Sequence, residues 1–196
     1  SGHKFHAPKG VGALYIRRGI YIKPLFYGGH QEKSRRPGTE NVPSIIGLGK
    51  AAELASTHLN NLDEIKRLRD KLENNILSKC PSAVINGGEE KRVPNTTNIG
   101  FQFIEGESIL LYLNEKGIAA SSGSACSSQS LEPSHVLKAM DIPFTTIHGS
   151  IRFSLSRFTT EKEIDYALSV LPDIIGRLLD ISPFWDSKKK EGKKMG

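Results

Sequence analysis

The chain has 196 residues, of which 37% are apolar, 7% aromatic and 24% charged, values that are ordinary for a globular protein and argue against global disorder. Of the net charge of +6, residues 187–196 contribute +4, from five lysines against one glutamate. We predict a disordered, solvated tail there, with contact to an acidic partner or membrane surface as the alternative, and no nucleic-acid-binding face. No apolar run approaches the roughly 18 residues that span a membrane.

The first part of the chain is rich in turn-forming residues. Residues 1–12 (SGHKFHAPKGVG) are predicted to form a loop, and residues 13–16 (ALYI) a short strand. Residues 20–43 again look like loop, and a connection of that length is usually functional or disordered. The chain also opens without a methionine, in the middle of a glycine-rich loop, which favours a fragment or a processed product.

From residue 44 to residue 79 apolar side chains recur at three-to-four spacing, with charges between them. This pattern predicts a long helix, either continuous or broken, which is suited to linking two domains. We expect residues 1–58 to belong to one domain together with the start of this linking helix, and residues 59–186 to form a small α/β domain.

The rest of the chain alternates short strands and helices, which implies an α/β or α+β sandwich. Thr160, with Glu163 three residues later, has the pattern of a capping box at a helix start. The predicted strands are residues 83–86, 97–103, 118–121 and 150–156, and the predicted helices are residues 107–116, 132–140 and 160–179.

Ser1, His3 and Lys4 place a hydroxyl, an imidazole and an amine within four residues of a glycine loop. Such a group could bind a phosphate and present an amine to a carbonyl. On these residues alone, an exposed lysine in a loop is the favoured interpretation.

The two cysteines lie in unlike contexts. Cys126 is surrounded by small polar residues (SSGSACSS), which predicts an exposed, mobile loop with an accessible thiol. Cys80 ends an amphipathic helix and is interpreted as structural. Neither belongs to a Cys/His cluster, so no metal site is expected, and two cysteines favour a reducing compartment.

Two arginine-containing segments could bind anions. Arg152 lies in an alternating strand pattern (IRFSL), where it is either a carboxylate partner or a rim charge. Residues 35–39 (RRPGT) combine arginine forks with a glycine and the Thr39 hydroxyl, although a solvated turn is an equal interpretation.

Taken together, these segments resemble group I cysteine desulfurases of the nitrogen-fixation and iron–sulfur-cluster type, within the class V aminotransferases. SGHKFHAPKGVGALYIRRG is similar to their cofactor-lysine segment, and IAASSGSACSSQSLEPSHVLKAM to their catalytic-cysteine loop. RRPGTENVP resembles the dimer-interface loop, and SIRFSLSRFTTEKEIDYAL the segment after the cysteine. The order and spacing match from residue 1 to about residue 185, and only the tail is not covered.

For the cofactor, the resemblance implies pyridoxal 5'-phosphate (PLP) in a fold-type I transferase. Lys4 would be the lysine that forms the Schiff base with PLP, and Ser1 and His3 would contact its phosphate. Thr39 would reach the phosphate in the partner subunit, so a homodimer is implied. Residues 1–58 would then be a remnant of the large PLP-binding domain.

For the chemistry, the resemblance implies conversion of L-cysteine to L-alanine. Arg152 would bind the substrate carboxylate, and Cys126 would take the sulfur as a persulfide and pass it to a sulfur-acceptor scaffold protein in iron–sulfur cluster assembly. A cytoplasmic protein is expected.

In the family, the groups that stack on PLP and pair with its ring nitrogen precede the lysine. We therefore expect this chain alone to bind PLP weakly and to be inactive or slow. The alternatives are a selenocysteine lyase or another class V PLP enzyme, and a non-catalytic binding module.

Overall fold

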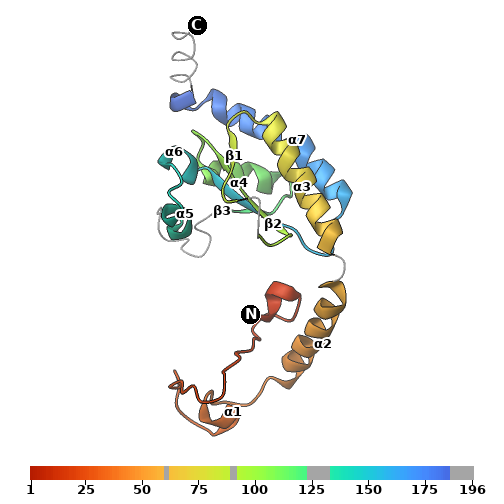
Figure 1. The fold of residues 1–196 in the computed structure, drawn as a ribbon, viewed down its shortest axis with the longest axis vertical. Coiled ribbons are helices and arrows are strands. Elements are labelled where there is room, and N and C mark those ends of the chain that lie inside the picture. Colours follow the sequence, from red (N-terminus) through yellow and green to blue (C-terminus); the bar gives the residue numbers. More distant parts are fainter. Residues whose placement is uncertain (60–61, 89–91, 123–132, 186–196) are drawn as a thin grey trace. The chain divides into compact units, whose positions relative to one another are not determined.

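The computed structural model describes residues 1–59, 62–88, 92–122 and 133–185. The chain divides into two compact units, residues 1–60 and residues 61–196. Figure 1 shows the first unit in red to orange and the second in yellow to blue.

The first unit contains a 3-10 turn, η1 (Gly2–Phe5), a short helix, α1 (Gln31–Ser34), and a longer helix, α2 (Val42–His58). The α2 helix begins at Asn41, whose side-chain oxygen accepts a hydrogen bond from the Ser44 N–H over 3.4 Å. Neither η1 nor α1 was predicted, because both are single turns without apolar periodicity. Most of the large apolar side chains between the two turns are exposed: Leu14, Tyr15, Ile20, Tyr21, Ile22, Leu25, Phe26 and Tyr27.

The strand predicted at residues 13–16 is wrong. These residues form no strand, and Leu14 and Tyr15 are 73% and 87% exposed. A strand exists only when a neighbouring strand satisfies its backbone hydrogen bonds. No described residue forms strand hydrogen bonds with this segment, so residues 13–16 do not form a strand despite their composition.

The long helix predicted from residue 44 to residue 79 is two helices, as its possible break suggested. The first is α2, and the second is α3 (Leu62–Lys79). One face of α3 is buried, through Leu68, Leu72 and Ile76, which recur at three-to-four spacing.

The second unit is built on an antiparallel sheet in the order β1-β2-β4-β3. Its elements are β1 (Ala83–Ile85), β2 (Thr96–Phe101), α4 (Gly106–Glu115), β3 (Ser121–Ser122), α5 (His135–Ala139), α6 (Phe144–Ile147), β4 (Ser150–Ser154) and α7 (Glu161–Asp180). The predicted α/β class is confirmed for this unit.

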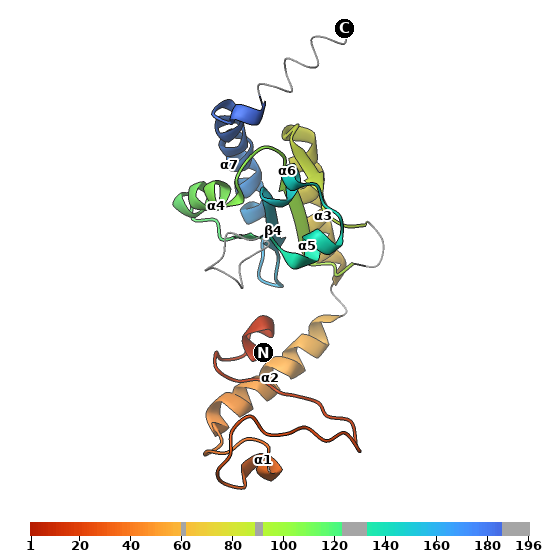
Figure 2. The ribbon, with the colours of Figure 1, turned by 90° about the vertical axis from the view of Figure 1, so that its left-hand side faces the viewer.

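The core lies on one face of this sheet. Ile99, Phe101 and Ile151 are fully buried there, and they belong to one cluster with apolar residues of α3, α4 and α7. Figures 1 and 2 show α3 and α7 side by side. On the opposite face α6 contacts β2, and the same face carries Arg152, which is exposed.

The third predicted strand lies at different residues. Residues 118–121 were expected, but β3 is Ser121–Ser122. The reason is the end of α4, where Gly117 has a φ of +73° and the Ile118 N–H donates to the Leu113 carbonyl over 2.9 Å. The Ile118 N–H is therefore bonded within this left-handed helix cap, and the strand begins further along the chain.

The capping box predicted at Thr160 is confirmed. The Thr160 N–H donates to the Glu163 carboxylate over 2.7 Å, and the Glu163 N–H donates to the Thr160 hydroxyl over 3.4 Å. The predicted helix at residues 132–140 is shorter, as α5, and α6 was not predicted because it has a single turn. Within the described residues, no helix is both long and apolar enough to cross a membrane.

Candidate active site

Lys4 lies on a tight turn at the start of the first unit. The Gly2 N–H donates to the Val11 carbonyl over 2.8 Å, and the Ala7 N–H donates to the Gly2 carbonyl over 3.0 Å. These bonds close residues 1–12 into what we call the lysine turn. Its backbone is therefore held by its own hydrogen bonds, which fixes the point from which Lys4 projects.

Two glycines let the lysine turn lie directly against α2. A Cβ on Gly2 would stand 2.9 Å from the Leu48 Cδ1, and a Cβ on Gly47 would stand 2.8 Å from the Pro8 Cγ. Both distances are below the contact limit for carbon atoms, so only glycine allows this approach. The helix α2 thus serves as a platform for the lysine turn.

Ser1, His3 and Lys4 are all exposed on the lysine turn. Among the described residues, none forms a hydrogen bond or ion pair with these three side chains. Their hydroxyl, imidazole and amine groups are therefore available together for a ligand that carries a phosphate and a carbonyl.

Thr39 lies in the same unit, on a separate loop. Gly38 before it has a φ of +95°, and its N–H donates to the Gln31 side-chain oxygen over 3.2 Å. The Thr39 side chain is exposed. No hydrogen bond between described residues joins it to the lysine turn.

Arg152 lies on β4 in the second unit, between Asn98 of β2 and Ser121 of β3. Its neighbours Ile151 and Phe153 point into the core, so the alternation of the strand turns Arg152 to the open face, where it is exposed. Among the described residues, none forms an ion pair or hydrogen bond with its guanidinium group. A guanidinium without a counter-ion on a rigid strand can bind a carboxylate through two donors.

Cys126 lies outside the described residues. In the sequence it comes four residues after Ser122, the last residue of β3, and β3 pairs with β4 at Arg152. The covalent chain therefore tethers Cys126 to the strand beside Arg152.

The other cysteine, Cys80, is not part of this site. It is 1% exposed, and burial raises the pKa of its thiol to about 11. Within the described parts of the chain, no group of histidine, cysteine and acidic side chains could hold a metal ion.

The sequence did not reveal a polar cluster on the face of the sheet that carries Arg152. The Asn86 Nδ2 donates to the Asn98 Oδ1 over 2.7 Å and to the Ser150 Oγ over 2.8 Å. The Ser150 Oγ donates to the Thr146 carbonyl over 2.9 Å. The signal available in the sequence was Asn98 itself, because asparagine is disfavoured in strands.

Comparisons with known proteins identify the family. The model of the aminotransferase class-V family matches residues 1–167. The chain belongs to the aminotransferase class-V family. Among curated relatives, a protein named cysteine desulfurase from Trichormus azollae is 62% identical over 185 residues. One named cysteine desulfurase NifS from Azotobacter vinelandii is 60% identical over 185 residues.

Both alignments cover 94% of this chain but 46% of the relative, so the chain spans about half the length of these class-V proteins. A solved structure titled NifS-like protein matches with a TM-score of 0.80 and 38% identity, over 91% of this chain and 45% of that one. The NifS-like protein from Rickettsia africae matches with a TM-score of 0.70 and 34% identity, over 79% and 40%.

The lysine turn fits the cofactor that this family implies. PLP carries a phosphate and an aldehyde, and the turn offers an exposed hydroxyl and imidazole on either side of Gly2, followed by an exposed amine. Gly2 also brings the backbone close to α2 without a side chain in the way. Ser1 and His3 would hold the phosphate, and Lys4 would bind the aldehyde carbon.

Proposed function

We propose that the protein to which this chain belongs is a PLP-dependent cysteine desulfurase. It converts L-cysteine to L-alanine and leaves a persulfide on Cys126, which a sulfur-acceptor protein of iron–sulfur cluster assembly then receives. The observation that carries this proposal is Arg152, an exposed guanidinium that forms no ion pair with any described residue, on the strand beside the one that leads to Cys126. Its support is the 62% identity to a cysteine desulfurase across 94% of the chain.

Arg152 selects an amino-acid substrate by its carboxylate. The planar guanidinium offers two parallel donors, which a lysine ammonium cannot do. Because β4 lies between β2 and β3, the backbone beneath Arg152 is bonded on both sides. The carboxylate is therefore held by a group whose own position is fixed.

Lys4 and Cys126 carry the bond-making steps. The bound cofactor supplies an electron sink for the substrate. The Lys4 amine takes the proton from the substrate Cα, and a proton is later returned to carbon. The Cys126 thiolate attacks the substrate sulfur, so an S–S bond forms and the substrate C–S bond breaks. L-cysteine and the Cys126 thiol thus become L-alanine and a Cys126 persulfide, with no external oxidant or reductant.

The proposal includes a homodimer in which Thr39 of one subunit contacts the phosphate bound by the other. It is supported by the exposed position of Thr39, on a loop that Gly38 and Gln31 hold together. A cytoplasmic location is also part of the proposal, because a reducing compartment keeps the Cys126 thiol available. In this assignment residues 1–58 belong to the large PLP-binding domain and residues 59–186 form the small domain.

The isolated chain is expected to turn over slowly or not at all. It spans about half the length of its relatives, and a cofactor pocket of which part is missing cannot position PLP. The activity belongs to the full-length protein.

The test is release of L-alanine and sulfide from L-cysteine, with PLP and a thiol reductant, by the full-length protein. Cys126→Ala should abolish both products, and Cys80→Ala should leave both unchanged because the Cys80 thiol is buried. An inactive wild-type protein, or a Cys126→Ala variant that still releases sulfide, would refute the proposal.

A further inference from the structure

We infer that Asn98 is a second donor to the substrate carboxylate, next to Arg152, and that Asn86 positions it. This inference rests on the proposed function, since it concerns the same substrate. It is carried by the polar cluster of Asn86, Asn98, Ser150 and Thr146 on the face of the sheet that carries Arg152.

Asn98 and Arg152 are direct cross-strand partners. They are paired in the register of β2 and β4, and the next pair on that face is Gly100 with Ser150. Side chains of directly opposed residues in an antiparallel pair lie on the same face, with Cβ atoms about 5 Å apart. The Asn98 amide therefore stands beside the Arg152 side chain.

A chain of hydrogen bonds determines which end of the Asn98 amide faces outward. The Thr146 carbonyl can only accept, so the Ser150 hydroxyl donates to it. The Ser150 oxygen must then accept from the Asn86 Nδ2. The same Nδ2 donates to the Asn98 Oδ1, which turns the Asn98 Nδ2 away from Asn86.

The Asn98 Nδ2 has no hydrogen-bond partner among the described residues. Arg152, its neighbour, has none either. Two adjacent donors without acceptors on one rigid sheet form a receptor for a ligand that only accepts, and a carboxylate is such a ligand.

Asn86 is suited to hold this orientation because it is itself fixed. Its side chain is 8% exposed, and both of its donated bonds lie in the cluster. The space for it exists because residue 100 is glycine, where a Cβ would stand 3.3 Å from the Asn86 Nδ2.

The experiment measures binding of two thiols that differ only in the carboxylate, 3-mercaptopropionate and 1-propanethiol, to the full-length PLP-loaded protein. Wild type should prefer 3-mercaptopropionate. Asn98→Ala should weaken it about tenfold to a hundredfold, as expected for loss of one hydrogen bond to a charged group, and leave propanethiol unchanged. Asn86→Ala should weaken 3-mercaptopropionate by less, because it frees the Asn98 amide to rotate without removing it.

Asn98→Asp keeps the acceptor for Asn86, replaces the outward donor with an acceptor and adds a negative charge opposite Arg152. It therefore tests carboxylate recognition without removing the hydrogen bond from Asn86. It should lose all preference for the carboxylate, at an unchanged melting temperature. The matched control is Asn95→Ala, whose amide donates to the Leu155 carbonyl at the end of the same strand pair; it should bind as wild type does.

The inference is overturned if Asn98→Ala binds 3-mercaptopropionate as wild type does, or if it weakens both thiols equally. It is also overturned if wild type shows no preference between them. Sulfide release in the same preparations reports separately on the desulfurase proposal, because binding of these thiols needs no turnover. In an active enzyme, Asn98→Ala should raise the KM for L-cysteine and leave kcat within about twofold.

Discussion

Arg92 donates from both of its Nη atoms to the two carboxylate oxygens of Glu73, over 2.9 and 2.7 Å. Glu73 lies on the buried face of α3, and Thr97 of β2 donates a third hydrogen bond to the same carboxylate. The carboxylate therefore joins three segments: α3, the residues before β2, and β2 itself. Asn98 follows Thr97 directly, so this ion pair supports the strand that carries Asn98.

Replacing Glu73 with glutamine should destabilise the protein by about 3 kcal/mol near pH 7, because a charged Arg92 loses its buried partner. Urea unfolding of the wild type and Glu73→Gln measures this difference. Glu115→Gln, a change at an exposed position of α4, is the matched control and should have little effect.

The ion pair of Glu73 and Arg92 also predicts how the stability of the protein depends on pH. Burial raises the pKa of Glu73, but hydrogen bonds from Arg92 and Thr97 outweigh it and hold the pKa below its ordinary value. In the unfolded chain the pKa of a glutamate is about 4.3. Because the pKa of Glu73 is lower in the folded protein, its ionised carboxylate stabilises the fold above that pH, and this stabilisation is lost as the pH falls through the folded pKa. The difference in the free energy of unfolding between wild type and Glu73→Gln should therefore become smaller below about pH 4. A difference that stays constant from pH 7 to pH 3 would contradict this account.

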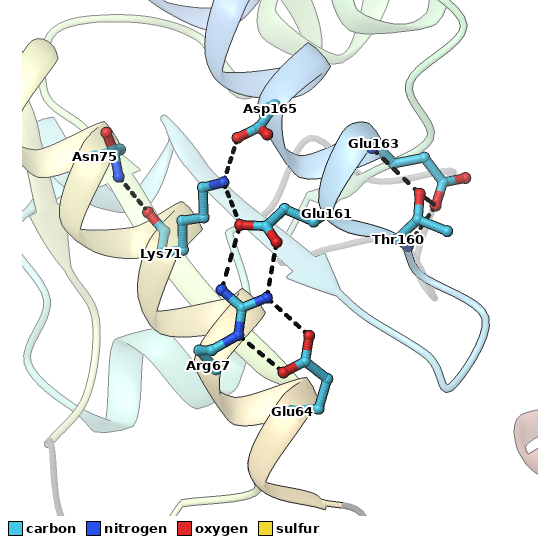
Figure 3. A network of polar contacts seen from close by, with 8 residues as sticks. All are labelled: Glu64, Arg67, Lys71, Asn75, Thr160, Glu161, Glu163 and Asp165. Carbon is cyan, nitrogen blue, oxygen red and sulfur yellow. Dashed lines mark hydrogen bonds and ion pairs between the residues drawn. The ribbon is translucent and has the colours of Figure 1, made fainter.

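A second network joins α3 to α7 at the surface (Figure 3). Arg67 donates to Glu161 over 3.3 and 3.0 Å, and Lys71 donates to Glu161 over 2.7 Å. The hydrogen bonds from Arg67, and then those from Lys71, lower the pKa of Glu161 to about 2. These groups are solvated, so their attraction is screened by salt.

Glu161→Gln should therefore lower the melting temperature slightly in dilute buffer and not at all in about 1 M salt, where the screening length is about 3 Å. Thermal unfolding at both salt concentrations measures this. Glu73→Gln serves as the comparison, because salt screens the buried ion pair of Glu73 and Arg92 far less. The loss of stability in Glu73→Gln should therefore persist in about 1 M salt. An equal loss for Glu161→Gln in both buffers would show that the network is not the exposed one described.

The elements that the sequence predicted well are those with a local signal. The α7 helix starts at Thr160 because the capping box is complete within four residues. The buried positions of β4 follow from the alternation of Ile151 and Phe153 with polar residues. Such patterns are set by neighbours in the sequence and can be found without a structure.

The features that the sequence did not reveal depend on partners far along the chain. Residues 13–16 have the composition of a strand but no described strand to pair with. The position of Asn98 beside Arg152 is a matter of register between two strands that lie more than fifty residues apart. Lys4, Ser1, His3, Thr39, Cys126 and Arg152 came from family resemblance, and their roles remain predictions.

The two cysteines should differ sharply toward an alkylating agent at pH 8. Thiolate is the reactive form, and burial raises the pKa of the Cys80 thiol to about 11, so almost none of it ionises at that pH. The native protein should take up one iodoacetamide, at Cys126, and a second only in denaturant. Mass spectrometry of the digested protein identifies the site. Native labelling of Cys80 at the rate of Cys126 would contradict the buried position.

Gly100 should be intolerant of any side chain, even a methyl group. A Cβ there would stand 2.2 Å from the Thr146 Cγ2 and 3.3 Å from the Asn86 Nδ2. Gly100→Ala must therefore move α6 off the sheet, which should cost about 1–3 kcal/mol, and disturb the hydrogen bonds that orient Asn98. Gly176→Ala is the matched control, because no described atom outside the neighbouring helix backbone lies within 4 Å of the new methyl group. It should stabilise the protein by about 0.5–1 kcal/mol, as alanine favours a helix over glycine. Chemical unfolding measures whether each variant is more or less stable than wild type. A Gly100→Ala protein as stable as wild type would show that α6 does not pack on β2 in this way.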